Sequence, residues 1–215
     1  MIDALRAIIR CLAFLASVPA AALAQEPYLL PPDARVANQT QEDWSRSWWQ
    51  WAASFEMYES PVADTTGERC GGHQSGEVWF LAGTYETKRT LRTCRVPRGK
   101  HLFFPLINYV VMPNPRKPIG CEAVTNTAAL MTERVSNLVL RIDGERYDDL
   151  AAHRQATREC FDIGVLVAPP VRMYPTAANG YYAMLRPLPP GTHTIDLGGI
   201  LPSMAQAITY TLIVE

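Results

Sequence analysis

Four cysteines, at positions 70, 94, 121 and 160, are the feature that most restricts how this chain can fold. An even number of cysteines in an exported protein predicts disulfides. Three pairings are possible, and we favour the sequential one, Cys70 with Cys94 and Cys121 with Cys160, because the others join distant parts of the chain. A four-thiolate zinc site is the alternative, but no pair has the short spacing of such sites. We therefore expect no metal and no cofactor.

The disulfide prediction depends on export, and residues 1–24 have the pattern of a signal peptide. Two arginines precede an apolar run from Cys11 to Val18, and the segment closes on an Ala-Leu-Ala triplet that ends at Ala24. Cleavage there would remove Cys11, the fifth cysteine, and leave an even number. The sequence thus predicts a secreted or periplasmic protein.

Charge and hydropathy exclude two classes of partner. The 215 residues have a formal net charge of −1, which becomes −2 without the leader, because the leader carries two basic residues and one acidic residue. This balance gives no support to nucleic-acid binding. No segment after the leader approaches the roughly 20 uninterrupted apolar residues of a membrane helix, so we expect no membrane span in the mature chain.

An amphipathic helix is predicted to begin near Thr40. Thr40 and Asp43 have the spacing of a capping box, and four aromatic residues then recur at steps of four, three and four. At about 100° per residue, these four rings lie within an arc of about 60°. We expect that face to pack on a sheet. The four residues are Trp44, Trp48, Trp51 and Phe55.

The segments on either side of this helix have different patterns. Residues 25–39 contain three prolines and predict an extended arm. Beyond Glu56, short apolar runs alternate with turn residues, and residues 121–134 favour one further helix. Glu77–Gly83 is apolar at nearly every position, which predicts a central strand. Residues 91–96 and 101–112 follow as strands, the second with an edge or bulge at Pro105.

The rest of the chain favours β-structure. Asp143-Gly144 predicts a tight hairpin turn, and the last two strands alternate apolar and polar residues. Many short strands with only one or two helices predict a mainly β fold, an antiparallel sandwich of jelly-roll or immunoglobulin-like type. We expect residues 40–215 to form a single domain, because about 190 residues suffice for one core.

Several motifs together resemble an uncharacterised family of secreted bacterial proteins. The resemblance covers about residues 40–110 well and the C-terminal strands more loosely. It implies an exported bacterial protein and adds no reaction, ligand or site residue. The motifs are Trp44-Ser45-x-x-Trp48-Trp49-x-Trp51, Asp64-x-Thr66-Gly67-x-x-Cys70, Val78-Trp79-Phe80-Leu81-Ala82-Gly83 and Cys94-x-Val96-Pro97-x-Gly99-Lys100.

Four residues are candidates for ligand binding. Trp49 lies about 140° from Trp44 on the helical wheel, away from the packed face, and is therefore the ring most suited to meet a ligand. His73 and Gln74 lie in the glycine-rich loop 71–76. His101 would approach His73 if the Cys94 strand paired with the Trp79 strand, and either imidazole could act as a base or ligand.

The remaining polar residues favour structural or solvent-exposed roles. His193 alternates with apolar residues and is expected to be buried and hydrogen-bonded, whereas His153 lies in a charged segment and is expected to be exposed. Asp64-Thr65-Thr66-Gly67 lacks the spacing of an aspartic protease loop, and Ser75 lacks a nucleophile elbow. A carboxylate pair for glycoside hydrolysis would have to come from Glu68, Glu77, Asp148, Asp149 or Glu159.

Three functional hypotheses follow. The leading one is an exported protein that binds an unidentified small molecule, glycan or envelope protein without catalysis. The second is a secreted hydrolase of envelope or extracellular polymers, with His73 or His101 and a carboxylate as acid and base. The third is a structural envelope protein.

Overall fold

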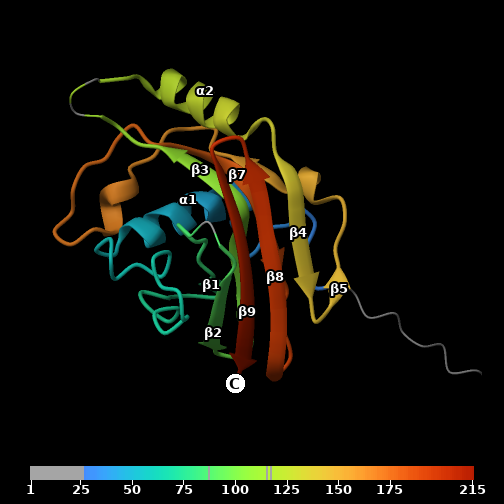
Figure 1. Ribbon diagram of the computed structural model, residues 1–215. Coiled ribbons are helices and arrows are strands. Elements are labelled where there is room, and N and C mark those ends of the chain that lie inside the picture. The colour runs from blue at the N-terminus through green and yellow to red at the C-terminus, as the bar shows by residue number, and fades with distance from the viewer. Residues whose placement is uncertain (1–26, 87, 115, 117) are drawn as a thin grey trace, which may run out of the picture.

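Two β-sheets and two α-helices make up the computed structural model, which describes residues 27–86, 88–114, 116 and 118–215 (Figure 1). The chain is mainly β, as predicted, and the expected signal peptide lies outside the described residues. The elements are α1 (Gln41–Ala53), β1 (Val78–Phe80), β2 (Thr90–Val96), β3 (His101–Val111), α2 (Cys121–Thr132), β4 (Ser136–Ile142), β5 (Glu145–Arg146), η1 (Leu150–His153), β6 (Arg154–Ala156), η2 (Ile163–Leu166), β7 (Ala177–Leu185), β8 (Gly191–Leu201) and β9 (Met204–Val214).

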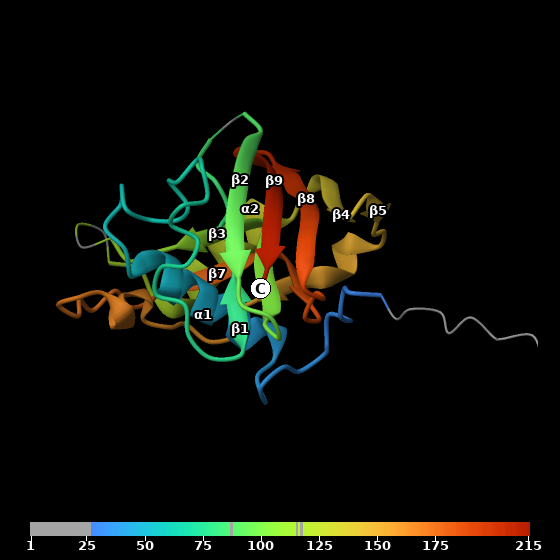
Figure 2. The same cartoon turned by 90° about the horizontal axis from the view of Figure 1, so that it is seen from below.

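Both sheets are mixed, so the expected wholly antiparallel arrangement is wrong. The strand orders are β1-β3-β7-β6 and β2-β9-β8-β4-β5; β1 runs parallel to β3 and β2 parallel to β9. Parallel neighbours need a crossover. For β1 and β3 the crossover contains β2, which belongs to the opposite sheet and lies beside β9 (Figure 2). The assignment to a jelly-roll or immunoglobulin-like type stays a prediction.

The strand predicted at Glu77–Gly83 is shorter than expected and is not central. Only Val78–Phe80 forms β1, at the edge of the four-stranded sheet. The run is apolar at nearly every position because both faces of β1 are covered. Val78 and Phe80 pack with the tryptophans of α1, and Trp79 packs against the core between the sheets. Because α1 covers the face of β1 that points away from the core, this edge strand has the apolar pattern expected of a central strand.

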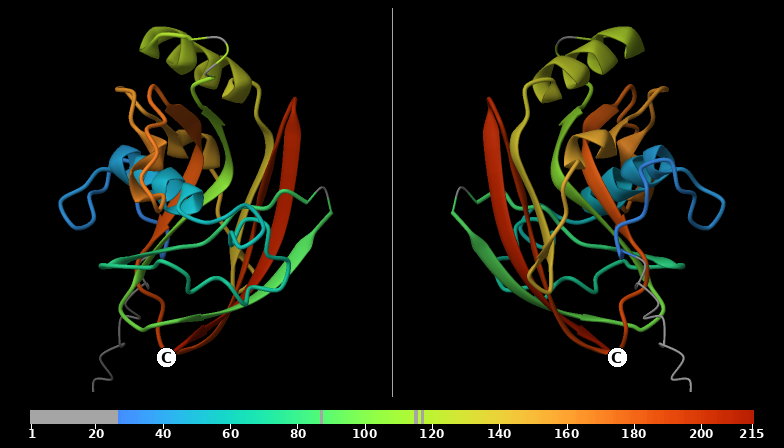
Figure 3. Two further views of the ribbon diagram at one scale, coloured as in Figure 1. Left: turned by 90° about the vertical axis from the view of Figure 1, so that its left-hand side faces the viewer. Right: turned by 90° about the vertical axis from the view of Figure 1, so that its right-hand side faces the viewer.

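The main core lies between the two sheets. Figure 3 shows β3 and β7 on one side of this core and β8 and β9 on the other, with α1 beyond β3 and β7. Strand β7 is buried along its whole length because the second sheet covers one face, α1 covers the other, and α2 packs against its start at Ala177. Facing residues of the core include Leu102, Phe104 and Leu185 from one sheet and Leu140, Ile195 and Leu212 from the other.

A bulge interrupts β3 at Pro105, as its proline predicts. The register with β7 shifts between Pro105 and Ile107. The side-chain amide of Gln206, from β9, donates to the carbonyl oxygens of Pro105 and Leu106 at 3.2 and 2.6 Å. Carbonyls at the bulge are thus satisfied from the opposite sheet.

The turn between β4 and β5 has the left-handed backbone expected of Asp143-Gly144, with φ of 51° and 84°. The Asp143 carboxylate also contacts β8, the other neighbour of β4 in the sheet. Asp143 Oδ2 lies 2.7 Å from Nδ1 of His193 on β8, and Nε2 of this histidine lies 2.9 Å from the Pro189 carbonyl oxygen. His193 is buried and hydrogen-bonded, which confirms its expected structural role.

Helix α1 begins after Thr40, whose side chain accepts from the backbone N–H of Asp43 while the Asp43 carboxylate accepts from the backbone N–H of Thr40. The Thr40 hydroxyl also donates to the Asp43 carboxylate at 2.7 Å, and this bond, together with that from the Thr40 N–H, holds the pKa of Asp43 below its usual range against the opposing effect of burial. Trp48 and Trp51 are buried and donate their indole N–H groups to the carbonyl oxygens of Leu81 and Gly72 at 2.9 and 3.0 Å. The helix is therefore fixed to two loops as well as to the sheet.

The segment before α1 runs along the end of β7. Leu29 forms a bridge with Leu185, and the Leu30 N–H donates to the Met184 carbonyl oxygen at 2.9 Å. In the described part of the chain, no helix is both long and apolar enough to cross a bilayer.

Two disulfides join Cys70 to Cys94 and Cys121 to Cys160, in agreement with the sequential pairing. The first ties the loop before β1 to β2. The second ties the start of α2 to the segment before η2. Each bridge therefore fixes an irregular segment to a regular element.

The side chain of Arg92, on β2, is buried although it carries a charge; only 3% of the residue is exposed. Its guanidinium donates to the carbonyl oxygens of Asp64 (2.7 Å), Gly83 (2.8 Å), Ala82 (3.1 Å) and Val62 (3.2 Å). Nη1 also lies 2.8 Å from the hydroxyl oxygen of Tyr210 on β9. One side chain therefore connects two loops to both strands of the β2–β9 pair.

Replacing Arg92 by methionine should lower the free energy of unfolding by about 3 to 5 kcal/mol, because the variant leaves buried carbonyls without donors. Arg95→Met is the matched control: Arg95 lies on the same strand but is exposed, and its ion pair with Glu215 joins two exposed side chains. That change should stay within about 0.5 kcal/mol. Urea unfolding followed by tryptophan fluorescence measures both. Equal losses in the two variants would contradict this role of Arg92.

Candidate ligand cavity

A cavity of about 550 Å³ lies beside α1, between the C-terminal part of β3 and the start of β9. Residues from the segments 55–62 and 83–85 also line it. This volume falls in the range of roughly 300 to 1,000 Å³ that is usual for small-molecule sites. The elements that surround it come from distant parts of the chain, as the spread of colours around α1 in Figure 1 illustrates.

Aromatic rings and thioethers dominate the wall of this cavity. Four of the seven methionines of the chain line it, from four separate segments. Flexible thioethers fit ligands of varied shape and make favourable contacts with aromatic rings. The wall is therefore suited to a flat apolar molecule. Its aromatic members are Trp48, Trp49, Phe55, Tyr85 and Tyr109, and its methionines are Met57, Met112, Met173 and Met204.

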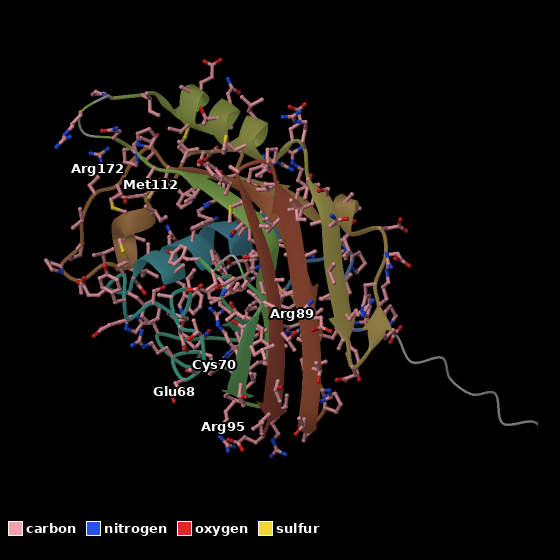
Figure 4. All side chains as sticks on the ribbon, in the orientation of Figure 1. Glu68, Cys70, Arg89, Arg95, Met112 and Arg172 are labelled. Carbon is pink, nitrogen blue, oxygen red and sulfur yellow. A yellow bond between two sulfur atoms is a disulfide. The ribbon has the colours of Figure 1, made fainter. Side chains whose placement is uncertain are left out.

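Three apolar residues of the wall are also exposed to solvent. Met57 is 68% exposed and Tyr85 is 70% exposed. Met112, which directly follows β3 and is labelled in Figure 4, is also exposed. Exposed large apolar side chains beside a cavity are typical of a ligand entrance. We take this side as the mouth of the cavity.

Trp49 lines the cavity, whereas Trp44 and Trp51 of the same helix do not. Its ring packs edge-on against Trp48 at a centroid distance of 5.0 Å. Its indole N–H donates to the hydroxyl oxygen of Tyr182 at 3.1 Å. Trp49 therefore lines the cavity while it also packs against two core clusters, and Trp48, which the helical wheel places on the packed face, lines the cavity as well. A ligand contact of Trp49 stays a prediction.

Four polar side chains also line the cavity: Ser60, Thr84, Asn108 and Gln206. All four are buried. The Asn108 amide donates to the Tyr182 hydroxyl oxygen at 3.2 Å. Burial raises the pKa of Tyr182, so that its phenol stays neutral at physiological pH, although the hydrogen bonds from Asn108 and Trp49 act in the opposite direction. Sequence reasoning missed Asn108; its signal is a lone amide within an apolar strand.

The segment 56–73 forms one wall and is stabilised from within. The Asp64 carboxylate accepts from the backbone N–H groups of Thr66 and Arg69 at 2.8 and 2.9 Å. Gly67 has a φ of 93°, and a Cβ there would lie 2.3 Å from the carbonyl oxygen of Thr93 on β2. Only glycine allows this approach. These contacts fix the position of Ser60 and Val62 at the cavity.

The other three predicted binding residues do not line this cavity. Gln74 clamps its own loop: its amide donates to the carbonyl oxygens of Cys70 and Phe80 and accepts from the Phe80 N–H. His101 pairs with Val78 in the β1–β3 ladder. The pairing of the Cys94 strand with the Trp79 strand, on which its approach to His73 depended, does not form, since β2 pairs with β9. Burial lowers the pKa of His101, against an opposing effect of Glu77. The hydrogen bonds of Gln74 within its own loop therefore give that residue a structural role.

His73 lines a separate, shallower depression of about 400 Å³ with Glu59, Glu68 and Arg69. Its ring stacks on Phe55 at 4.1 Å, and its Nδ1 lies 2.8 Å from the hydroxyl oxygen of Ser54. His101 does not line this depression, so the predicted histidine pair is not brought together there. The contact between Ser54 and His73 was not predicted, because its residues come from two different segments.

The remaining histidine and the candidate carboxylates also have clear positions. His153 is buried, so its expected exposure is wrong; burial lowers its pKa. It belongs to η1, which turns its ring inward despite the charged neighbours. The five carboxylates considered for glycoside hydrolysis are all exposed. Within the described residues, no cluster of three or more histidine, cysteine or acidic side chains could hold a metal.

No protein-family model, curated protein or solved structure matches this chain. The resemblance to an exported bacterial family therefore stays a prediction.

Asp64 predicts a pH dependence of stability. Burial raises the pKa of this carboxyl, but hydrogen bonds from Arg69 and Thr66 outweigh that effect and hold the pKa below its usual value. A lowered folded-state pKa stabilises the fold above about pH 4, the unfolded value, and the stabilisation disappears as pH falls through the folded-state pKa. The difference in free energy of unfolding between wild type and Asp64→Asn should therefore be largest above about pH 5 and shrink toward pH 2.

Urea unfolding at a series of pH values measures this difference. Asp148→Asn removes an exposed carboxylate and serves as the control. A difference for Asp64→Asn that stays constant, or grows as pH falls, would contradict the prediction.

Proposed function

We propose that this chain is an exported binding protein that takes up a small, largely apolar aromatic molecule in the cavity beside α1. The observation that carries the proposal is the wall itself, in which five aromatic residues and four methionines surround about 550 Å³ and a few buried polar groups interrupt them. Concave sites of this composition are typical of ligand binding. Trp49 is the residue most suited to stack on the ligand.

Export is part of the same proposal. The leader pattern at residues 1–24 and the two disulfides support a periplasmic or extracellular protein, because such bridges persist in oxidising compartments. We propose a bacterial origin on the motifs at Trp44–Trp51 and Val78–Gly83. For the fold, we propose a sandwich of two mixed sheets, in which the two parallel pairs argue against a purely jelly-roll or immunoglobulin-like connectivity.

Binding of the neutral dye N-phenyl-1-naphthylamine tests the proposal. The purified protein should brighten the dye, and Trp49→Ala should weaken its binding by about tenfold, because the variant loses an aromatic contact surface. Trp44→Ala is the matched control: Trp44 lies on the same helix and is also half-buried, but it donates to the Val36 carbonyl oxygen and does not line the cavity.

A second variant tests the same site from the opposite direction. Ala52 lines the cavity, and Ala52→Leu should reduce binding by occupying part of its volume. All variants are compared at a temperature where circular dichroism shows them folded. Dye binding that is unchanged in both Trp49→Ala and Ala52→Leu, or that falls equally in Trp44→Ala, would overturn the proposal.

A secreted hydrolase is the second candidate, and the contact between Ser54 and His73 is the observation that favours it. The pair has the separation of a nucleophile and its base. However, the Ser54 hydroxyl donates its only hydrogen to the Trp51 carbonyl oxygen at 2.7 Å, so that His73 Nδ1 must act as the donor toward Ser54. This direction does not activate the serine. Ser54 then serves as the C-terminal cap of α1.

Turnover of p-nitrophenyl esters separates the two candidates. Hydrolysis that is abolished by both Ser54→Ala and His73→Ala would favour the enzyme, whereas the binding proposal expects no turnover above that of buffer. A structural envelope protein, the third hypothesis, would show neither dye binding sensitive to Trp49 nor ester turnover.

A further inference from the structure

Asn108 differs from the other polar residues of the cavity wall. It lies on β3, is only 6% exposed and lines the cavity. Its register partner on β7 is Gly180, where a Cβ would lie 2.5 Å from Cα and Cβ of Asn108. The absence of a side chain at Gly180 therefore gives Asn108 the room to occupy this buried position.

Only one end of the Asn108 amide is engaged. The nitrogen donates to the Tyr182 hydroxyl oxygen, which also accepts from Trp49. Among the residues that the structure describes, none donates to the Asn108 side-chain oxygen. This oxygen is not one of the buried atoms that lack a partner, so it is accessible from the cavity, where a ligand that donates to it would gain one hydrogen bond.

The other buried polar groups of the wall are already used by the protein. Gln206 accepts from the Thr84 N–H and donates to two carbonyl oxygens. Thr84 is hydrogen-bonded to Thr90, and the Ser60 hydroxyl oxygen accepts from the Val62 N–H. Asn108 is thus the strongest acceptor that the wall offers to a ligand.

The position of this acceptor restricts the shape of the ligand. Asn108 is buried, whereas the exposed residues Met57, Tyr85 and Met112 lie at the mouth. An acyl-chain amphiphile would bury its chain and leave its polar head at the mouth, out of reach of a buried amide. A compact molecule that enters with its polar group first would satisfy Asn108 and leave its apolar part against the methionines.

We infer that the ligand is a compact aromatic molecule with one hydrogen-bond donor, a phenolic hydroxyl or ring N–H, that donates to the side-chain oxygen of Asn108. This inference rests on the proposed function and specifies its ligand class. Trp49 then contacts the ring, and the same residue, through Tyr182, holds the Asn108 amide in place.

A matched pair of probes tests the inference. 2-Naphthol carries the donor, and 2-methoxynaphthalene has the same ring system without it. Competition with N-phenyl-1-naphthylamine should show that wild type binds 2-naphthol roughly 3- to 10-fold more tightly, the effect of one buried hydrogen bond. Asn108→Leu, of similar size, should abolish this preference while it retains the binding of 2-methoxynaphthalene.

Ser60→Ala is the control, because it removes another buried polar group from the same wall and should keep the preference. If Asn108→Leu does not fold, Asn108→Ala replaces it: this variant also lacks the acceptor oxygen and should likewise lose the preference for 2-naphthol. Equal affinity of wild type for both probes, or a preference that survives Asn108→Leu, would overturn the inference and leave the proposed function standing. Displacement of the dye by palmitate but by neither naphthalene would also overturn it. Failure of every probe to bind would remove the proposed function as well.

Discussion

The buried guanidinium of Arg92 is the interaction on which the other parts of the structure depend. It donates to carbonyl oxygens in the segment 62–64 and in the segment 82–83, and it contacts the Tyr210 hydroxyl on β9. Neither loop has a regular ladder to satisfy those carbonyls. A guanidinium has five N–H donors in a fixed plane, and a lysine ammonium could not reach the same acceptors. Because Val62 and Gly83 also line the cavity, the guanidinium that fixes these two loops to β2 also shapes the proposed site.

The tryptophans of helix α1 serve both packing and the cavity. Trp48 and Trp51 are buried and bonded to loop carbonyls, and Trp48 also lines the cavity together with Trp49. Trp49 is nevertheless not free to move, because Tyr182 accepts its N–H. A ring held in this way loses little side-chain entropy when a ligand binds, which favours affinity for flat molecules. The thioethers opposite supply the adaptability that the rigid ring lacks.

Features set by neighbours in the sequence could be predicted, and features set by distant contacts could not. The capping box at Thr40, the bulge at Pro105 and the turn at Asp143 follow from the chemistry of a few adjacent residues. The parallel pairing of β2 with β9 has no local signal, because the two strands are distant in the chain. The edge position of β1 has none either, since an edge strand covered by a helix has the same pattern as a central one. The same limit applies to the cavity. Trp49 is a candidate from the helical wheel alone, whereas the contact of Asn108 with Tyr182 depends on pairing with another strand.

The crossing of β2 into the second sheet also sets an order of assembly. Among the residues that the structure describes, β2 has only β9 as a neighbour in its sheet, and β9 is the last strand. Until that strand arrives, the N-terminal half has no partner for β2 and no Tyr210 beside Arg92, so the guanidinium stays in water. Contacts between residues so distant in sequence slow folding, because a long loop must close before they form. The disulfide between Cys70 and Cys94 closes a much shorter loop, and it ties β2 to the preceding segment without needing β9.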